Sequence, residues 1–224
     1  MTTPPPPPLL VVAHGSRDRR HAATVSALAA RARALAPGTR VAVGYLDFDA
    51  PSVDRALTEL YAAGARRVVA VPLLLARAFH AKADIPAVLR ASAARLPGLT
   101  IRRADVLGPD PLLLAALERR LAQAGVGRAD RAETGVVLAS AGSSDPEAIA
   151  VFATAAREWR RAAGWCAVRP AFASGSRPTT ADALPPVRAD GGPPGARAPR
   201  GIPPGPQPAP EMARPPAAGP HPGG

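Results

Sequence analysis

The sequence has little cysteine, few aromatic residues and no long apolar run, and each shortage excludes a class of protein. The single cysteine, Cys166, rules out a disulfide within the chain and fits a reducing compartment. Aromatic residues make up only 4% of the chain, so Ala, Val and Leu must form most of the core. The longest apolar runs, such as Val68–Ala76, are far shorter than the ~18 residues of a membrane span. The N-terminus also lacks the pattern of a signal peptide, so we expect a cytoplasmic protein that does not contact a membrane.

Lysine is almost missing too, although the chain carries a net charge of +11. Of the 28 basic residues only Lys82 is a lysine, and the arginines are scattered over predicted helices. They do not form stripes interleaved with aromatic residues, so the charge is weak evidence for nucleic acid, and we expect no such partner. A positive field fits an anionic small substrate equally well.

Between residues 9 and 184, apolar strand-like runs alternate with amphipathic Ala/Leu/Arg stretches, a pattern typical of β/α units. The predicted strands are Leu9–Ala13, Val41–Leu46, Val68–Leu75, Leu99–Arg103 and Gly135–Ser140. The predicted helices are Arg20–Ala36, Pro51–Ala63, Ile85–Leu96 and Pro111–Ala124. Right-handed crossovers between parallel strands then imply a doubly wound α/β sheet with the strand order 2-1-3.

An internal repeat appears when the sequence is compared with itself. A shift of 127 residues without a gap sets Ala13–Asp18 over Ser140–Asp145. The same shift aligns more distant positions: Val41 with Val168, Tyr45 with Phe172, and Pro51 with Pro178. We interpret the chain as two copies of one α/β domain, the first at residues 9–127 and the second, incomplete, at residues 134–184.

The second copy stops half-built, because the shift sets the predicted strand Val68–Leu75 over Gly195–Ile202. That segment is rich in Pro, Gly and Arg and cannot form a central strand. Residues 185–224 contain 14 Pro and 8 Gly, so they are predicted to be disordered, as is the Pro-rich segment 1–8. The alternative is a slip of the reading frame near Leu184.

Two histidines follow predicted strands that should be neighbours. His14 comes directly after the first strand, and His80 lies just beyond the third. Ligands of such sheets bind at the carboxyl ends of the strands where the strand order reverses, so both imidazoles are predicted to face one crevice. They would form a partial site for Fe²⁺, Co²⁺, Ni²⁺ or Zn²⁺, with open positions that suit transfer of the ion. Alternatively, each is a hydrogen-bonding loop residue, as we expect for His21 and His221, which lack this context.

The turn after His14 is a candidate binding element. Gly15 allows close approach of the backbone, and the N–H groups near Ser16, at the start of a helix, attract anions. Simple N-capping by Ser16 or Asp18 is the alternative. The second copy keeps the Gly-Ser-x-Asp pattern but has Ala141 in place of His14, which indicates a structural role for the turn and a chemical one for the histidine.

Three further polar residues are predicted to lie around the crevice that the two histidines face. Asp47 ends the second strand, where its carboxylate is a candidate to assist the metal or accept a proton, and capping of the next helix is the alternative. Arg77 and Lys82 flank His80 and are candidates for binding substrate carboxylates. The alternative for both is a solvated loop charge.

Several motifs, in this order, resemble those of the CbiX/SirB sirohydrochlorin chelatases. They are His14–Asp18 after a strand, Tyr45–Ser52, Gly64–Leu75, Phe79–Pro86 and Leu107–Pro111. The resemblance covers about residues 9 to 184.

The resemblance implies a class II chelatase that inserts Fe²⁺ or Co²⁺ into sirohydrochlorin, with the metal as substrate and no organic cofactor. His14 and His80 match the metal-site histidines of the family, and Asp47 stands where the family usually has Glu. Short members of the family act as homodimers, so a homodimer is possible. Two alternatives remain: a non-catalytic metal or tetrapyrrole carrier, and a phosphate-binding hydrolase with His14 as nucleophile.

Overall fold

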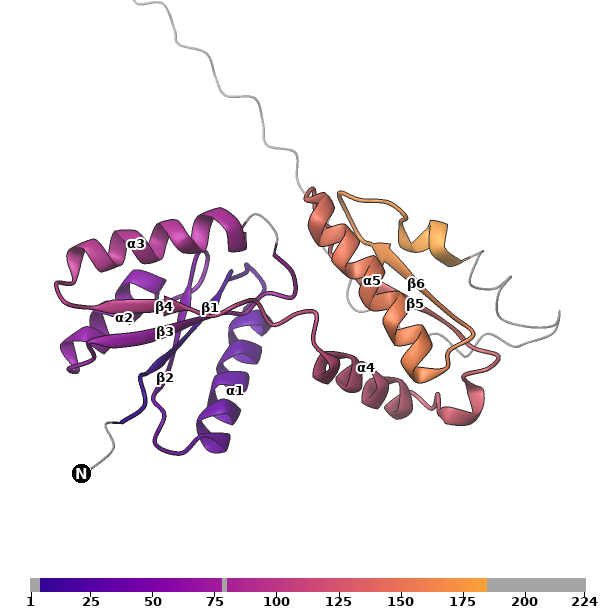
Figure 1. The fold of residues 1–224 in the computed structure, drawn as a ribbon, viewed down its shortest axis with the longest axis horizontal. Helices are drawn as coiled ribbons and strands as arrows, with labels where there is room; N and C mark the ends of the chain where they lie inside the picture. Colours follow the sequence, from indigo (N-terminus) through magenta and orange to yellow (C-terminus); the bar gives the residue numbers. More distant parts are fainter. Residues whose placement is uncertain (1–4, 78–79, 185–224) are drawn as a thin grey trace, which may run out of the picture.

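The computed structural model describes residues 5–77 and 80–184 (Figure 1). The predicted disordered tail, residues 185–224, lies outside this range, as do residues 1–4. Pro8 was included in the predicted disordered N-terminus, but its carbonyl accepts a hydrogen bond of 2.9 Å from the Val69 N–H. The chain is therefore already tied to a strand one residue before the first strand begins.

The first unit is built on a four-stranded parallel sheet with the order β2-β1-β3-β4. The strands are β1 (Leu9–Ala13), β2 (Val41–Tyr45), β3 (Arg67–Pro72) and β4 (Thr100–Arg103). The predicted strand order 2-1-3 is thus confirmed. Because β1 pairs in parallel with both β2 and β3, the three strands end at one edge of the sheet.

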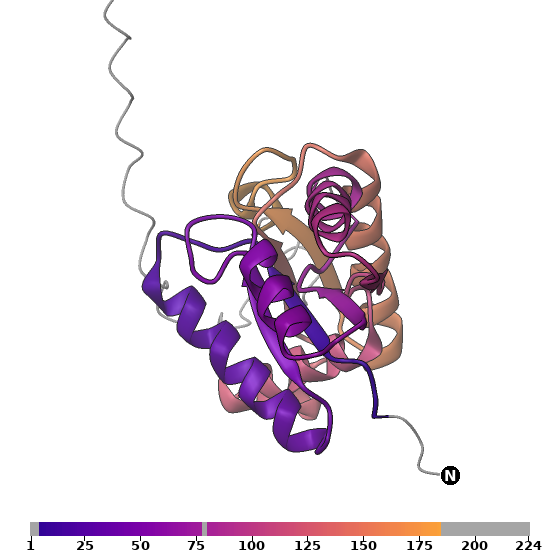
Figure 2. The ribbon, with the colours of Figure 1, turned by 90° about the vertical axis from the view of Figure 1, so that its left-hand side faces the viewer.

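Helices cover both faces of this sheet (Figures 1 and 2). They are α1 (Arg19–Leu35), α2 (Val53–Ala62) and α3 (Ile85–Arg95), and a π-helical turn, η1 (His80–Asp84), leads into α3. Side chains of a strand alternate between faces. Leu10 of β1 is therefore buried against α2 and α3 with Leu57 and Ile85, whereas Ala13 packs beside Val25 of α1.

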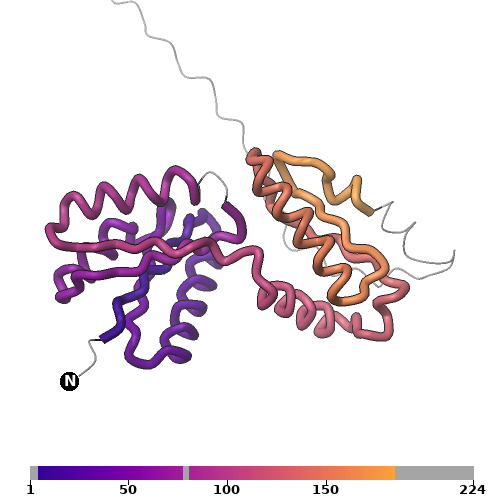
Figure 3. The backbone as a smooth tube through the Cα atoms, in the orientation of Figure 1, coloured from indigo at the N-terminus to yellow at the C-terminus, as the bar shows by residue number. Residues whose placement is uncertain are grey.

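The second unit contains α4 (Pro111–Gln123), a short 3₁₀ turn η2 (Arg128–Asp130), β5 (Gly135–Ser140), α5 (Pro146–Ala163) and β6 (Ala167–Phe172). The strands β5 and β6 form a two-stranded parallel sheet, and residues 180–184 are helical at the end of the described range. Figure 3 shows the chain leaving β4 and reaching this unit through α4. Among the described residues, no helix has both the length and the apolarity that crossing a bilayer requires.

The helix α4 packs with the second unit. Its residues Leu114, Leu117 and Leu121 lie against a core that includes Trp159 and Trp165. The predicted first domain, residues 9–127, included this helix because it follows the fourth strand in the order of a β/α unit. The apolar face of α4 was visible in the sequence, but the partner of that face, the core of the second unit, was not.

The duplication extends to individual hydrogen bonds. The shift of 127 residues superposes the register of β1 and β2 on that of β5 and β6. It also relates the backbone bonds just beyond the strands: Leu46 N–H to Ala13 O matches Ala173 N–H to Ser140 O, and Tyr45 N–H to Pro51 O matches Phe172 N–H to Pro178 O. The two units are therefore two copies of one strand–helix–strand structure.

One carboxylate fastens α4 to the second unit. Glu118 accepts hydrogen bonds from the indole N–H groups of Trp159, at 2.5 Å, and Trp165, at 2.8 Å. It also forms an ion pair with Arg131, whose guanidinium lies 5.2 Å from the centre of the Trp165 ring. Glu118 thus satisfies three donors that the packing of α4 withdraws from water.

Replacing Glu118 with alanine is expected to destabilise the second unit by about 2–4 kcal/mol, because three partly buried donors lose their acceptor. The change is measured by chemical denaturation followed by tryptophan fluorescence, since both tryptophans of the chain lie in this unit. The control is Arg177→Ala, which removes an exposed pair with Asp182 in the same unit and is expected to cost about 0.5 kcal/mol or less. Equal effects of the two substitutions would contradict the role of Glu118.

Candidate active site

The edge where β1 and β2 end brings the backbones of His14 and Asp47 together. Beyond the last strand residues, Leu46 N–H donates to Ala13 O and Asp47 N–H donates to His14 O, both at 2.9 Å. The two chains therefore stay paired for one residue past the sheet. A side chain in each of these positions lies at the carboxyl end of the sheet, beside the point where the strand order reverses.

Gly15 makes this pairing possible. Its φ is +95°, and a Cβ atom added there would lie 1.8 Å from the carbonyl oxygen of Asp47. Only glycine fits so close a contact. The predicted close backbone approach at Gly15 is thus present, and the group that approaches is the chain's own carbonyl.

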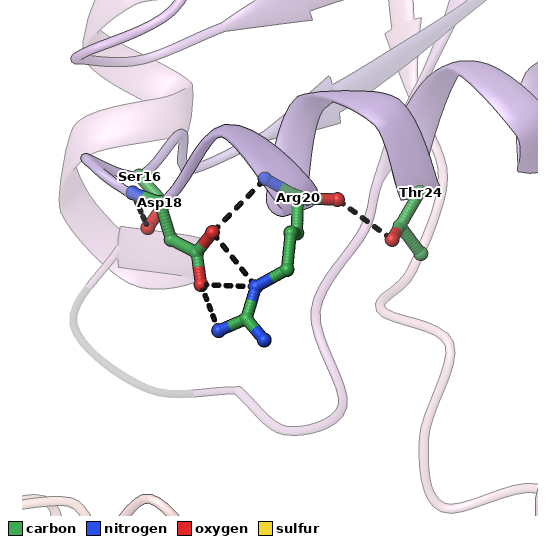
Figure 4. A network of polar contacts seen from close by, with 4 residues as sticks. All are labelled: Ser16, Asp18, Arg20 and Thr24. Atoms are coloured by element: carbon green, nitrogen blue, oxygen red, sulfur yellow. Dashed lines mark hydrogen bonds and ion pairs between the residues drawn. The ribbon is translucent and has the colours of Figure 1, made fainter. Parts of the chain in front are cut away.

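The Ser16–Asp18 turn is held by its own hydrogen bonds (Figure 4). Ser16 Oγ accepts from Asp18 N–H at 3.1 Å, and Asp18 caps α1 by accepting from Arg20 N–H at 3.0 Å. The Arg20 guanidinium, 2.6 Å from Asp18, and the Arg20 N–H lower the pKa of the Asp18 carboxyl to about 2. Capping by Asp18, one of the two readings of this turn, is therefore observed.

Asp49 engages the predicted anion-binding group of this turn. Its Oδ2 accepts from the Ser16 N–H at 3.0 Å and lies 3.6 Å from Nδ1 of His21. An external anion at Ser16 would have to displace this carboxylate. Sequence reasoning assigned no partner to His21 or Asp49, because 28 residues separate them and only the paired ends of β1 and β2 bring them together.

The His14 ring has a defined orientation. Its Nδ1 lies 3.1 Å from the carbonyl oxygen of Gly15. A carbonyl oxygen can only accept a hydrogen bond, so this contact requires the proton on Nδ1 and places the lone pair of the neutral ring on Nε2. An imidazole fixed in this tautomer by a carbonyl is the usual form of a metal ligand or a base.

An exposed aromatic ring lies beside His14 and was not singled out by sequence reasoning. The Phe48 ring centre is 6.1 Å from that of His14, and the Arg17 guanidinium is 5.4 Å from the same ring. Phe48 is 52% exposed and has a φ of +60°, which is uncommon for a residue other than glycine. The sequence signal that could have identified Phe48 was an aromatic residue between two aspartates, Asp47 and Asp49, in a polar loop.

Asp47 does not cap the next helix, so this alternative reading of its carboxylate is wrong. Its Oδ1 accepts from the adjacent Phe48 N–H at 2.9 Å, and Ser52 caps α2 by accepting from Arg55 N–H at 3.2 Å. Within the described ranges, no group of three or more His, Cys, Asp or Glu side chains is arranged to hold a metal ion.

His80 begins η1, and its backbone belongs to the described structure while its side chain and residues 78–79 do not. The segment is anchored to the first unit by Arg103 of β4, whose Nη1 donates to the Ala81 carbonyl at 2.6 Å. Because β1 and β3 are neighbours in the sheet, the chain segments that carry His14 and His80 leave adjacent strands at the same edge. The predicted convergence of the two imidazoles stays a prediction.

The two candidate carboxylate-binding side chains are paired within the protein. Arg77 forms an ion pair with Asp105, and the Lys82 ammonium contacts Asp145 and Glu147, each at 2.7 Å. Arg77, Lys82 and Arg103 line a small hollow of about 50 Å³ beside η1. Substrate carboxylates would therefore exchange with carboxylates of the chain itself.

The second copy preserves this turn without its histidines. Gly142 makes the same approach, with an added Cβ 1.7 Å from Ser174 O, and Ser143 N–H donates to Ser176 Oγ at 3.1 Å. The positions equivalent to His14, His21 and Asp49 hold Ala141, Ala148 and Ser176. The backbone of the turn is therefore independent of the ionisable groups that only the first copy carries.

Comparison with known proteins matches the first unit together with α4. The CbiX family model matches residues 8–124. The chain is 30% identical over 136 residues to the sirohydrochlorin ferrochelatase of Bacillus subtilis, covering 61% of this chain and 51% of that protein. It is 31% identical over 105 residues to the sirohydrochlorin cobaltochelatase of Priestia megaterium, covering 46% and 34%. The matched part spans about half the length of the ferrochelatases.

Solved structures agree with the observed architecture. SirB from Bacillus subtilis with Fe³⁺ superposes with a TM-score of 0.72 at 26% identity, covering 80% of this chain and 69% of that one. The cobalt complex of SirB from Bacillus subtilis subspecies spizizenii gives 0.64 at 25% identity, covering 72% and 65%. The strand order and the internal repeat define a duplicated, doubly wound α/β protein with the fold of SirB. The chain belongs to the CbiX family.

Proposed function

We propose that this protein is a sirohydrochlorin chelatase that inserts Fe²⁺ or Co²⁺ into the macrocycle. The observation that carries the proposal is His14, held in one tautomer by a carbonyl at the carboxyl end of β1, in a chain of the CbiX family. The relatives named ferrochelatase and cobaltochelatase, and the SirB complexes with Fe³⁺ and cobalt, support both metals as candidates.

The proposed chemistry requires side chains at the carboxyl edge of the first sheet to bind the metal ion and to accept protons. Insertion of a divalent ion releases two protons from pyrrole nitrogens, and a neutral imidazole can bind the ion or accept a proton. We assign metal delivery and proton acceptance jointly to His14 and His80, with Asp47 as a further oxygen ligand. No organic cofactor is part of the proposal.

Macrocycle binding is proposed for the positively charged side of the same edge. Gly15 and Ser16 supply the turn, and Arg77 and Lys82 supply cations for the carboxylates of sirohydrochlorin. In the free protein these cations contact Asp105, Asp145 and Glu147, so binding is an exchange of one carboxylate for another. The cytoplasmic location and a homodimer are predictions of the same proposal.

A second candidate is a metal or tetrapyrrole carrier that does not turn over. It is favoured by the incomplete second copy, in which Ala141 replaces the histidine. The decisive experiment supplies a tenfold excess of sirohydrochlorin and Fe²⁺ or Co²⁺ over protein under anaerobic conditions. A chelatase converts many equivalents faster than the protein-free control, whereas a carrier affects about one equivalent and then stops.

A further inference from the structure

We propose that the second unit positions residues 81–84, the segment that follows His80, through Lys82, which the carboxylates of Asp145 and Glu147 bind. The inference rests on the proposed function in treating this segment as part of the active site. Lys82 is then a positioning residue, and the second copy contributes to the site although it lacks an equivalent of His14.

The geometry shows a cation shared between two acceptors. Lys82 Nζ donates to Asp145 Oδ2 and to Glu147 Oε2, each at 2.7 Å. Lys82 lies in η1 of the first unit, and both acceptors lie at the start of α5 in the second. The hydrogen bond from Lys82 lowers the pKa of the Asp145 carboxyl, and the hydrogen bonds to Asp145 and Glu147 raise that of the Lys82 ammonium.

The duplication explains how the pair of carboxylates that binds Lys82 arises. In the first copy, Asp18 caps α1 and is neutralised by Arg20 two residues later. In the second copy, Asp145 caps α5 in the same way, but Glu147 occupies the position of Arg20. The exchange of Arg for Glu turns a self-neutralised cap into a pair of carboxylates, and that pair binds the only lysine of the chain.

Residues 81 and 82 are held by contacts from both units. From the first unit, Arg103 donates to the Ala81 carbonyl at 2.6 Å, and Ala81 itself is buried. From the second unit, Asp145 and Glu147 hold Lys82, the next residue. An isolated surface ion pair contributes little, but a cation that two acceptors share loses its side-chain entropy only once.

The test measures backbone hydrogen exchange of residues 81–84 in the full chain, without metal or sirohydrochlorin. Lys82→Met, and separately the double variant Asp145→Asn with Glu147→Gln, are expected to accelerate exchange there by about threefold to tenfold. Asn keeps the N-cap of α5, so the double variant removes charge without removing the cap. The control, Arg55→Met, breaks an exposed pair elsewhere and should leave these amides unchanged.

A charge exchange provides the rescue. Lys82→Glu with Asp145→Asn is expected to exchange fast, and adding Glu147→Lys is expected to restore slow exchange through one reversed pair. Unchanged exchange in Lys82→Met would overturn the proposal, and this variant decides the matter if the double variant fails to fold. Because no turnover is measured, inactivity of the parent protein would refute the proposed function and leave the positioning role standing.

Discussion

Replacing His14 with alanine is expected to weaken Co²⁺ binding by at least about tenfold. The loss of a ligand should cost no less than the 10–100-fold that follows from loss of a supporting hydrogen bond around a metal. The measurement is a titration of the full chain with Co²⁺, followed by the visible absorption of the bound ion. His80→Ala is expected to have an effect of similar size.

His21→Ala is the matched control for this titration. His21 lies near the start of α1, seven residues after His14, and its Nδ1 is 3.6 Å from Asp49. The second copy has Ala148 at this position and still forms the turn, so the substitution is compatible with the backbone. Co²⁺ affinity is expected to stay within about twofold of the parent. Equal losses in the His14 and His21 variants would refute the specific role of His14.

The substitution Gly15→Ala is expected to have the largest effect on stability in the first unit, at least about 4 kcal/mol. A methyl group at this position would lie 1.8 Å from Asp47 O, a backbone atom that is itself tied to its neighbours. The ends of β1 and β2 would have to separate, and the bond from Asp47 N–H to His14 O would break. Circular dichroism during thermal unfolding, together with hydrogen exchange of β1, measures the change.

Gly38→Ala separates the effect of backbone conformation from that of contact. Gly38 has a φ of +88°, close to that of Gly15, but a Cβ atom there would meet no atom within 4 Å. Its replacement should therefore cost only the left-handed conformation, about 1–2 kcal/mol. If Gly15→Ala cost no more than Gly38→Ala, the close approach would not be a constraint on the turn.

The strands β1 and β5 were predictable because each is a short apolar run at the start of one copy of the repeat. Leu9–Ala13 and Gly135–Ser140 were predicted with the observed bounds, whereas the strand predicted at Val68–Leu75 ends at Pro72. Leu73 N–H still donates to Val12 O at 2.7 Å, but Leu74 and Leu75 lie past the residue opposite Ala13, where β1 ends, so they leave the sheet. Apolar character alone does not indicate where a neighbouring strand stops.

The sequence predicted individual residues of the candidate site, but it did not predict which of them contact one another. His14 was proposed as a site residue from its place after a strand, and the second copy, which keeps the turn without the histidine, distinguished it from that turn. The contact of Asp49 with Ser16 and His21, and that of Lys82 with the second unit, depend on how β1, β2 and the two units lie against one another. No local pattern encodes those distances.

The most direct test of the proposed function is an anaerobic absorbance time course of sirohydrochlorin with Fe²⁺ or Co²⁺. It compares the parent chain, His14→Ala, His80→Ala and a protein-free control. The proposed function predicts metallation by the parent faster than the control, and loss of that acceleration in both variants. A folded parent protein that metallates no faster than the control would contradict it.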